Sequence, residues 1–122
     1  MRFEQEFLRK LLARIKEVQW DGGYHDLRIE DRPERVVSRY IQLLDEAGLI
    51  DAADFSTHNT MCWRAKWITE AGERFLRAAQ NERCWQLAQK MIRSSHRKLT
   101  LKALDQALPK ARRELRKKAR TR

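Results

Sequence analysis

Hydrophobic residues recur at helical spacing along much of the chain and predict most of its structure. The first such stretch runs from Phe3 to Val18, and the paired glycines Gly22 and Gly23 end it because they favour turn geometry. The spacing predicts helices over about residues 4–18 and 34–47, around residues 69–79 and 85–92, and along a last stripe that begins at Leu101.

Residues that commonly cap helices stand at the ends of these stretches. Asp31 is a candidate cap for the second helix, and Pro33 fits its first turn. Gly48 suits the left-handed position that ends this helix. Thr69 and Thr100 are candidate caps for later helices. The chain therefore divides into short helices with defined ends.

An alternation of apolar and polar residues follows Gly48 and predicts a β-hairpin. One candidate strand begins at residues 49–52, a second covers residues 61–68, and the polar loop 56–60 joins them. The second strand is predicted to place four side chains on one face, namely Met61, Trp63, Ala65 and Trp67. Before the second helix, residues 24–29 have room only for a short extended segment.

The last apolar stripe contains a proline. Leu101, Leu104 and Leu108 are helically spaced behind Thr100, and Pro109 then predicts a kink or two short helices. This leucine seam has two possible partners, the body of the protein or a second copy of the chain, so a homodimer is one expectation.

The predicted elements give a mainly α protein with a small β-hairpin, which is an α+β fold. Their order indicates a winged-helix-like domain with a C-terminal helical extension. Residues 19–33 leave no room for the helix that precedes the recognition helix in a full helix-turn-helix. The motif that would read DNA is therefore truncated.

Three stretches of sequence carry a resemblance to a known family. They are Phe7-Leu8-Arg9-Lys10-Leu11-Leu12, residues 43–50, and Ile68-Thr69-Glu70-Ala71-Gly72-Glu73-Arg74-Phe75-Leu76 together with Trp85. Over about residues 3–105 the chain resembles the domain-of-unknown-function 2513 family. The resemblance implies a short bacterial, phage or prophage protein of winged-helix-like type, from a family without an established activity.

Charge divides the chain into two parts. Of 122 residues, 36% are charged, and the formal net charge is +10. Residues 1–92 hold 15 basic and 15 acidic side chains, whereas residues 93–122 hold 12 basic and 2 acidic ones. The sequence therefore predicts a neutral winged-helix-like body over residues 1–92 and a basic helical extension over residues 93–122.

Several classes of protein are disfavoured by the sequence. No apolar run approaches the roughly 20 residues that a bilayer span needs, and the first residues do not resemble a signal peptide. Cys62 and Cys84 are isolated, so we expect free thiols and a cytoplasmic protein. Histidines, cysteines and carboxylates show no ligand or catalytic spacing. We therefore expect a protein that is not an enzyme and has no metal or cofactor.

The second helix is a candidate for reading nucleic acid. Its predicted outer face holds side chains that suit base edges and phosphates, namely Arg35, Ser38, Arg39 and Gln42. The alternative is an ordinary solvated face, because Glu34, Asp45 and Glu46 dilute its positive charge.

The hairpin and the extension supply further cations. Arg64 and Lys66 fall on one side of the predicted wing, where they either contact phosphate or protect a sheet edge. The extension carries the strongest charge, with Lys110, Arg112, Arg113, Arg116, Lys117 and Lys118. Such a segment attracts nucleic acid or an acidic protein, fits a membrane poorly, and otherwise acts as a solubilising tail.

The four tryptophans, Trp20, Trp63, Trp67 and Trp85, are candidate stacking platforms for unpaired bases. Three of them fall on core-facing positions, which favours core anchors. The leading hypothesis is a nucleic-acid-binding regulator of phage or prophage type. The alternative is a protein-interaction module, such as a phage-encoded modulator of a host enzyme or defence complex, which the neutral body and the truncated motif favour.

Overall fold

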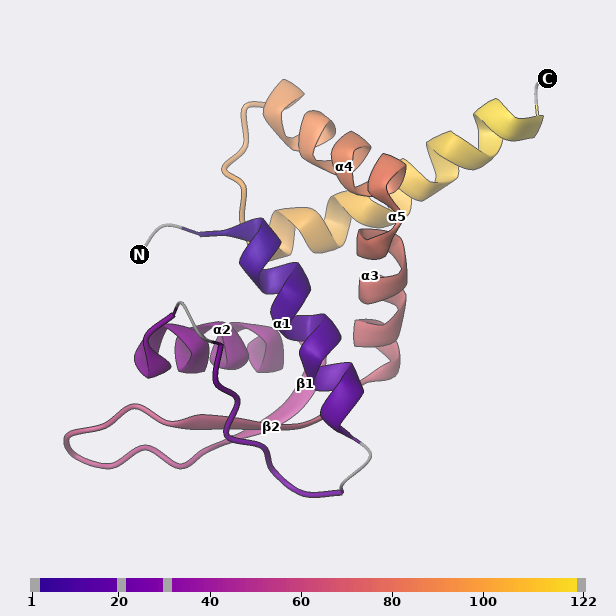
Figure 1. Ribbon diagram of the computed structural model, residues 1–122. Coiled ribbons are helices and arrows are strands. Elements are labelled where there is room, and N and C mark those ends of the chain that lie inside the picture. Colours follow the sequence, from indigo (N-terminus) through magenta and orange to yellow (C-terminus); the bar gives the residue numbers. More distant parts are fainter. Residues whose placement is uncertain (1–2, 20–21, 30–31, 121–122) are drawn as a thin grey trace.

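The computed structural model describes residues 3–19, 22–29 and 32–120 (Figure 1). Its elements, in chain order, are α1 (Gln5–Val18), α2 (Glu34–Glu46), β1 (Ile50–Asp54), β2 (Trp63–Ile68), α3 (Glu70–Gln80), α4 (Glu82–Ser94) and α5 (Leu101–Arg120). The predicted mainly α fold with one small β-hairpin is confirmed. Trp20 and Asp31 lie outside the described residues, so the role of that tryptophan stays a prediction. Pro33 was predicted in the first turn of α2 behind a cap at Asp31, but it is itself the residue that precedes the helix, which has no side-chain cap among the described residues.

Helix ends follow the local sequence. The Thr69 and Thr100 hydroxyls each accept a backbone N–H three residues later, from Gly72 and Ala103, both at 3.1 Å. Gly48 adopts a φ of 77°, the left-handed conformation expected after α2. His96, with a φ of 57°, lies between α4 and α5. These features confirm the predicted starts of α3 and α5 and the predicted end of α2, whereas α4 begins at Glu82, before the predicted stretch 85–92.

Pro109 lies inside the single helix α5, so the expectation of two short helices is wrong. A proline removes one backbone donor and crowds the preceding turn, which favours a break when a helix stands alone. Here Leu104, Leu108 and Ala111 on either side of it are buried in the core, and this packing supports the helix across the proline.

The core passes through all the helices. Leu8, Leu11, Leu12 and Ile15 of α1 are fully buried, and Figure 1 shows this helix between α2, α3 and the hairpin. The leucine seam of α5 packs on α4 and α3 and belongs to the same core. The change of charge near residue 93 is therefore not a boundary in the packing, although the last turns of α5 extend beyond the other helices in Figure 1.

The hairpin contains a bulge that the alternation of residues did not predict. In the antiparallel register Asp51 faces Trp67 and Ala52 faces Ala65, so Lys66 has no partner opposite it. An extra residue of this kind shifts the in–out alternation by one position. Ala65 is consequently buried and Trp67 is 42% exposed, which corrects the prediction that the two share a core-facing side.

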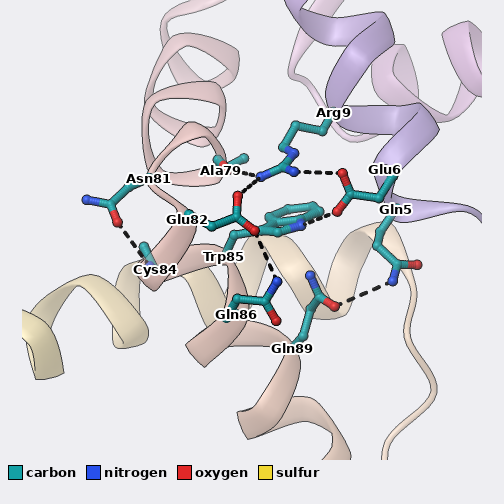
Figure 2. Close-up of polar contacts among 10 residues, drawn as sticks. All are labelled: Gln5, Glu6, Arg9, Ala79, Asn81, Glu82, Cys84, Trp85, Gln86 and Gln89. Atoms are coloured by element: carbon teal, nitrogen blue, oxygen red, sulfur yellow. Dashed lines mark hydrogen bonds and ion pairs between the residues drawn. The ribbon is translucent and has the colours of Figure 1, made fainter.

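A polar junction fixes α4 against α1 (Figure 2). One guanidinium nitrogen of Arg9 donates to the Ala79 carbonyl and to Glu82, both at 3.0 Å, and the other donates to Glu6 at 2.6 Å. Glu6 also accepts the indole N–H of the buried Trp85 at 2.8 Å. These contacts satisfy a carbonyl at the end of α3 and tie the first turn of α4 to α1 through the Glu82 side chain.

Within the described residues, none of the helices has the length and apolar character that crossing a membrane requires.

Candidate functional site

The outer face of α2 is less available for binding than the sequence predicted. Ser38 is only 3% exposed, and its hydroxyl accepts the Trp63 backbone N–H at 3.0 Å. It also lies 3.5 Å from the Met61 carbonyl, to which it donates. The predicted contact of Ser38 with phosphate is therefore wrong, because β2 packs over this position of the helix. Ser38 instead ties α2 to the hairpin.

The remaining polar residues of α2 bond mostly to one another. Arg39 donates to the Gln42 side-chain oxygen at 2.9 Å, and the Gln42 amide donates to Glu46 at 3.1 Å. Arg35 is exposed and lines a hollow of about 560 Å³ with Glu34 and hairpin residues 56–61. Arg39 is therefore linked to Glu46 through Gln42, and Glu34 lines the same hollow as Arg35.

The hairpin cations lie over aromatic rings. Arg64 is 4.8 Å from the centre of the Phe55 ring. The Lys66 ammonium is 4.5 Å from the Trp67 ring and 5.3 Å from the Tyr24 ring. Both side chains are half-buried by these contacts, as cation–π pairs at a surface often are.

The cations predicted for the extension lie on α5 in three settings. Lys110, in the middle of the helix, lines a small hollow with Arg97 and Met91. Lys117 and Lys118 are exposed near its end, and the Lys117 ammonium is 3.7 Å from Glu114. The remaining three, Arg112, Arg113 and Arg116, face α3 and contribute to one groove.

This arginine groove consists of two adjoining hollows of about 450 and 310 Å³ between α3 and α5. Ala78, Arg112 and Arg116 line both of them. The full set of arginines lining the groove is Arg74, Arg77, Arg112, Arg113 and Arg116. Its floor is apolar and includes Phe75 and Leu108.

Sequence analysis missed the α3 half of this groove. Arg74 and Arg77 belong to the body whose charges sum to zero, and nothing in their spacing connects them with residues 112–116. Their separation of three places them on one side of a helix, which is the signal that was available. Their meeting with α5 depends on tertiary packing.

The electrostatics of the groove favour anions. Among the described residues lining the two hollows, Asp105 is the single carboxylate. Partial burial raises the pKa of Asp105, and the nearby Arg74 offsets this rise in part. Burial likewise raises the pKa of the Cys84 thiol beneath the groove, while Arg112 acts in the opposite direction. Five guanidinium groups thus line the groove together with one carboxyl whose pKa is raised, and the pair Arg74–Glu70, at 3.7 Å, adds a second carboxylate at its edge.

One further group of possible ligand atoms lies near the hairpin. Among the described residues, the carboxylates of Asp26 and Glu34 and the thiol of Cys62 lie within 4.8 Å of one another. These residues come from three separate segments, which is why spacing along the sequence did not reveal them. Acidic groups commonly gather on surfaces without an ion, and we assign this group no role.

The chain belongs to the family described as hypothetical protein (DUF2513), whose model matches residues 2–97. The predicted resemblance is therefore confirmed. An uncharacterized protein of Haemophilus influenzae is 36% identical over 70 residues, which are 57% of this chain. The chain spans 59% of the length of that relative. No solved structure matches the chain. The α5 arginines lie beyond the residues that the family model matches.

Proposed function

We propose that this member of the DUF2513 family is a nucleic-acid-binding protein whose arginine groove holds the sugar–phosphate backbone. The observation that carries the proposal is the convergence of five arginines from α3 and α5 on one groove, where Asp105 is the single carboxylate among the described lining residues. One of the five, Arg74, also pairs with Glu70 of α3 at 3.7 Å. Phosphate groups are spaced regularly along a nucleic acid, so a groove with several guanidinium groups binds more than one of them.

Arginine suits this role better than lysine. Its planar fork donates two parallel hydrogen bonds to phosphate, and its charge is retained at any physiological pH. The exposed Arg113 and Arg116 are accessible from solvent, whereas Arg112 is half-buried. The net charge of +10 adds long-range attraction for a polyanion. Sequence-independent backbone binding is the expected result.

In this function the winged-helix-like face, formed by α2 and the hairpin, has a secondary role. Arg35 and the hairpin form a second surface outside the proposed phosphate contacts, and Ser38 has no part in it because it is buried. We propose a binding protein rather than an enzyme, located in the cytoplasm. A regulatory role on phage or prophage DNA belongs to the same proposal.

A second candidate function is the binding of an acidic protein. The observation that favours it is the apolar floor of the groove, where Phe75, Leu108 and Pro109 lie between the arginines. An amphipathic helix with one acidic and one apolar side would suit such a surface. A phosphate backbone makes less use of an apolar floor.

Fluorescence anisotropy with a short labelled DNA duplex at low salt tests the proposal. The groove variant Arg112→Gln/Arg116→Gln should bind about 10-fold or more weakly than the wild type, because two phosphate contacts are lost. The matched control Lys10→Gln/Lys90→Gln removes the same charge from exposed positions on α1 and α4, outside the groove.

The control should stay within about twofold of the wild type, the change expected from screened charges alone. Equal losses in both variants would show that only net charge matters and would contradict the proposal. Competition by poly-glutamate at the same charge concentration separates the two candidates. If only a large excess of poly-glutamate displaces the duplex, the result supports nucleic acid as the ligand. If the protein binds poly-glutamate in preference to the duplex, the result supports an acidic protein partner.

A further inference from the structure

Three large aromatic side chains are exposed together beside the hairpin. Tyr24 is 44% exposed, and Phe55 and Trp67 are 42% exposed each. These three are the exposed large hydrophobic residues of the described chain. We call them, with the cations Arg64 and Lys66, the hairpin aromatic patch. Scattered exposed aromatics are ordinary on a protein surface, but a gathering of all of them indicates a contact surface.

The backbone brings the patch together from three segments. A β-bridge between His25 and Ala65 holds the segment that contains Tyr24 against β2, with hydrogen bonds of 2.7 and 3.3 Å. Phe55 follows β1 and bonds to the Cys62 carbonyl at 2.8 Å. The Tyr24 and Phe55 rings meet edge to face with their centres 5.5 Å apart. The rings are thus held by main-chain bonds.

The bulge at Lys66 completes the patch. Because Lys66 has no partner opposite it, the residue after it turns outward, and Trp67 joins the surface that carries the cations. Bulges commonly redirect a side chain beside a functional surface. Without the extra residue Trp67 would point into the core on the side of Ala65. The irregularity therefore exposes a tryptophan that regular pairing would bury.

We infer that the hairpin aromatic patch stacks unpaired nucleobases, so that the protein prefers single-stranded nucleic acid or a single-strand junction. This inference rests on the proposed function, because the patch supplies stacking and the arginine groove supplies charge. Aromatic side chains alternating with cations are the usual platform for single strands. Every base offers a flat face, so such a platform tolerates any sequence.

The charges around the patch favour a base over an acidic peptide. Asp51 faces Trp67 across the hairpin, and the Asp54 carboxylate accepts the Ser56 backbone N–H at 2.8 Å. These two acids balance Arg64 and Lys66, so the patch has no positive excess that would attract a carboxylate-rich peptide. A nucleobase is uncharged and gains from the ring faces themselves.

The patch also lies within reach of the groove along one strand. Trp67 and Arg74 are joined through the first turn of α3, so their Cα atoms are at most about 17 Å apart. A stacked strand rises about 3.4 Å per nucleotide, so about five nucleotides cover that distance. One short single strand can therefore contact both surfaces.

Substitutions at Trp67 separate stacking from simple apolar contact. Trp67→Phe keeps an aromatic face, whereas Trp67→Leu keeps an apolar side chain without one. The probes are a labelled oligothymidylate about 12 nucleotides long and a duplex of the same length, measured by anisotropy at low salt. The groove variant Arg112→Gln/Arg116→Gln is measured in parallel, and thermal unfolding confirms that each variant is folded.

The wild type should bind the oligothymidylate more tightly than the duplex. Trp67→Leu should weaken oligothymidylate binding about 5- to 100-fold, as the loss of a stacked base does, and leave duplex binding within about twofold. Trp67→Phe should retain most of the affinity. The groove variant should weaken both probes.

Unchanged oligothymidylate binding by Trp67→Leu overturns the inference while leaving the proposed function intact. Loss through Trp67→Leu without any loss in the groove variant supports stacking and contradicts the proposed groove. Binding of poly-glutamate that Trp67→Leu weakens, without binding of oligothymidylate, overturns the inference in favour of a protein partner.

Discussion

The α2 face and the arginine groove differ in how their charges are placed. On α2, Arg35 lies beside Glu34, and Arg39 bonds to Gln42, which in turn bonds to Glu46. In the groove, five arginines line the surface with one carboxylate, Asp105, among the described lining residues, and Arg74 also pairs with Glu70. A helix that looks suited to reading nucleic acid therefore has its polar groups largely occupied, whereas the groove has donors to offer.

The comparison shows that the sum of charges over a segment does not locate a binding surface. Residues 1–92 sum to zero, but two of their arginines, Arg74 and Arg77, belong to the most positive part of the molecule. Other acids of the same segment lie elsewhere, for example at the junction of α1 with α4 in Figure 2, although Glu70 pairs with Arg74 at 3.7 Å. Folding separates charges that are mixed along the sequence.

Gly72→Ala should have the largest effect of these substitutions, a loss of stability, because it changes how α3, one wall of the groove, packs on its neighbours. A Cβ at this position would overlap the Leu49 carbonyl oxygen and the Ile68 side chain. Since the backbone cannot yield cheaply, we expect a loss of about 3 kcal/mol or more in the free energy of unfolding. Urea denaturation measures this change.

Gly23→Ala is the control for that substitution, because nothing lies within 4 Å of a Cβ there. It should be neutral or stabilise by up to about 1 kcal/mol. A Gly72→Ala variant as stable as Gly23→Ala would show that α3 does not pack against Leu49 as described.

Ser38→Ala should lower the free energy of unfolding by about 1–3 kcal/mol, because the Trp63 backbone N–H loses its acceptor in a buried environment. Nucleic-acid affinity of the folded variant should be unchanged. Arg39→Ala, at an exposed position of the same helix, should change the unfolding free energy by about 0.5 kcal/mol or less. A Ser38→Ala variant that keeps full stability but binds nucleic acid more weakly would contradict the buried position of Ser38 and support its predicted contact with phosphate.

The rates at which Cys84 and Cys62 react with a thiol reagent test the arginine groove and the hairpin separately. Cys84 is buried beneath the groove and burial raises the pKa of its thiol, whereas Cys62 near the hairpin is half-buried. We expect Cys84 to react with a thiol reagent about 10-fold or more slowly, since the thiolate is the reactive form. Cys62→Ser should abolish the faster of the two phases of the reaction, which is the modification of Cys62. A fast phase that survives in Cys62→Ser would show that the groove is open down to Cys84.

Asp105→Asn should have the smallest effect, an increase in nucleic-acid affinity of about fivefold or less at low salt, since one nearby negative charge is removed. Because burial raises the pKa of Asp105, the folded protein holds this proton at a higher pH than the unfolded chain does. The penalty that its charge imposes on stability therefore builds up as pH rises from the pKa of the unfolded chain to the raised pKa of the folded protein, and it is absent below the unfolded pKa.

Affinity of the wild type should accordingly approach that of Asp105→Asn as the pH falls through this pKa. Binding titrations of both proteins over a pH series measure the convergence. A constant ratio between the two proteins at every pH would show that Asp105 does not act through its charge.

Local features of the fold were predictable from the sequence, and features that depend on contacts between elements were not. The periodicity of α1 and the caps Thr69, Thr100 and Gly48 are properties of neighbouring residues, and the structure confirms them. The continuation of α5 through Pro109 was not predicted, because packing outweighs the local cost of the proline.

The site residues show the same division. Ser38 sits on the predicted outer face of α2, but β2 covers that position, which no helical pattern reveals. The bulge at Lys66 leaves no mark in the alternation of residues, and it moves Trp67 from the predicted core to the surface. The arginines of α5 were identified by their charge, whereas their partners on α3 required the packing of the two helices.

The salt dependence of duplex binding tests the central claim most directly. Each phosphate contact adds about 0.9 to the magnitude of the log–log slope of affinity against salt concentration. The account predicts that Arg112→Gln/Arg116→Gln lowers this magnitude by about 2, and that Arg35→Gln/Arg39→Gln on α2 leaves it within about 0.5 of the wild-type value. A reduction of about 2 in the α2 variant with an unchanged slope in the groove variant would place the backbone contacts on α2 and contradict the account.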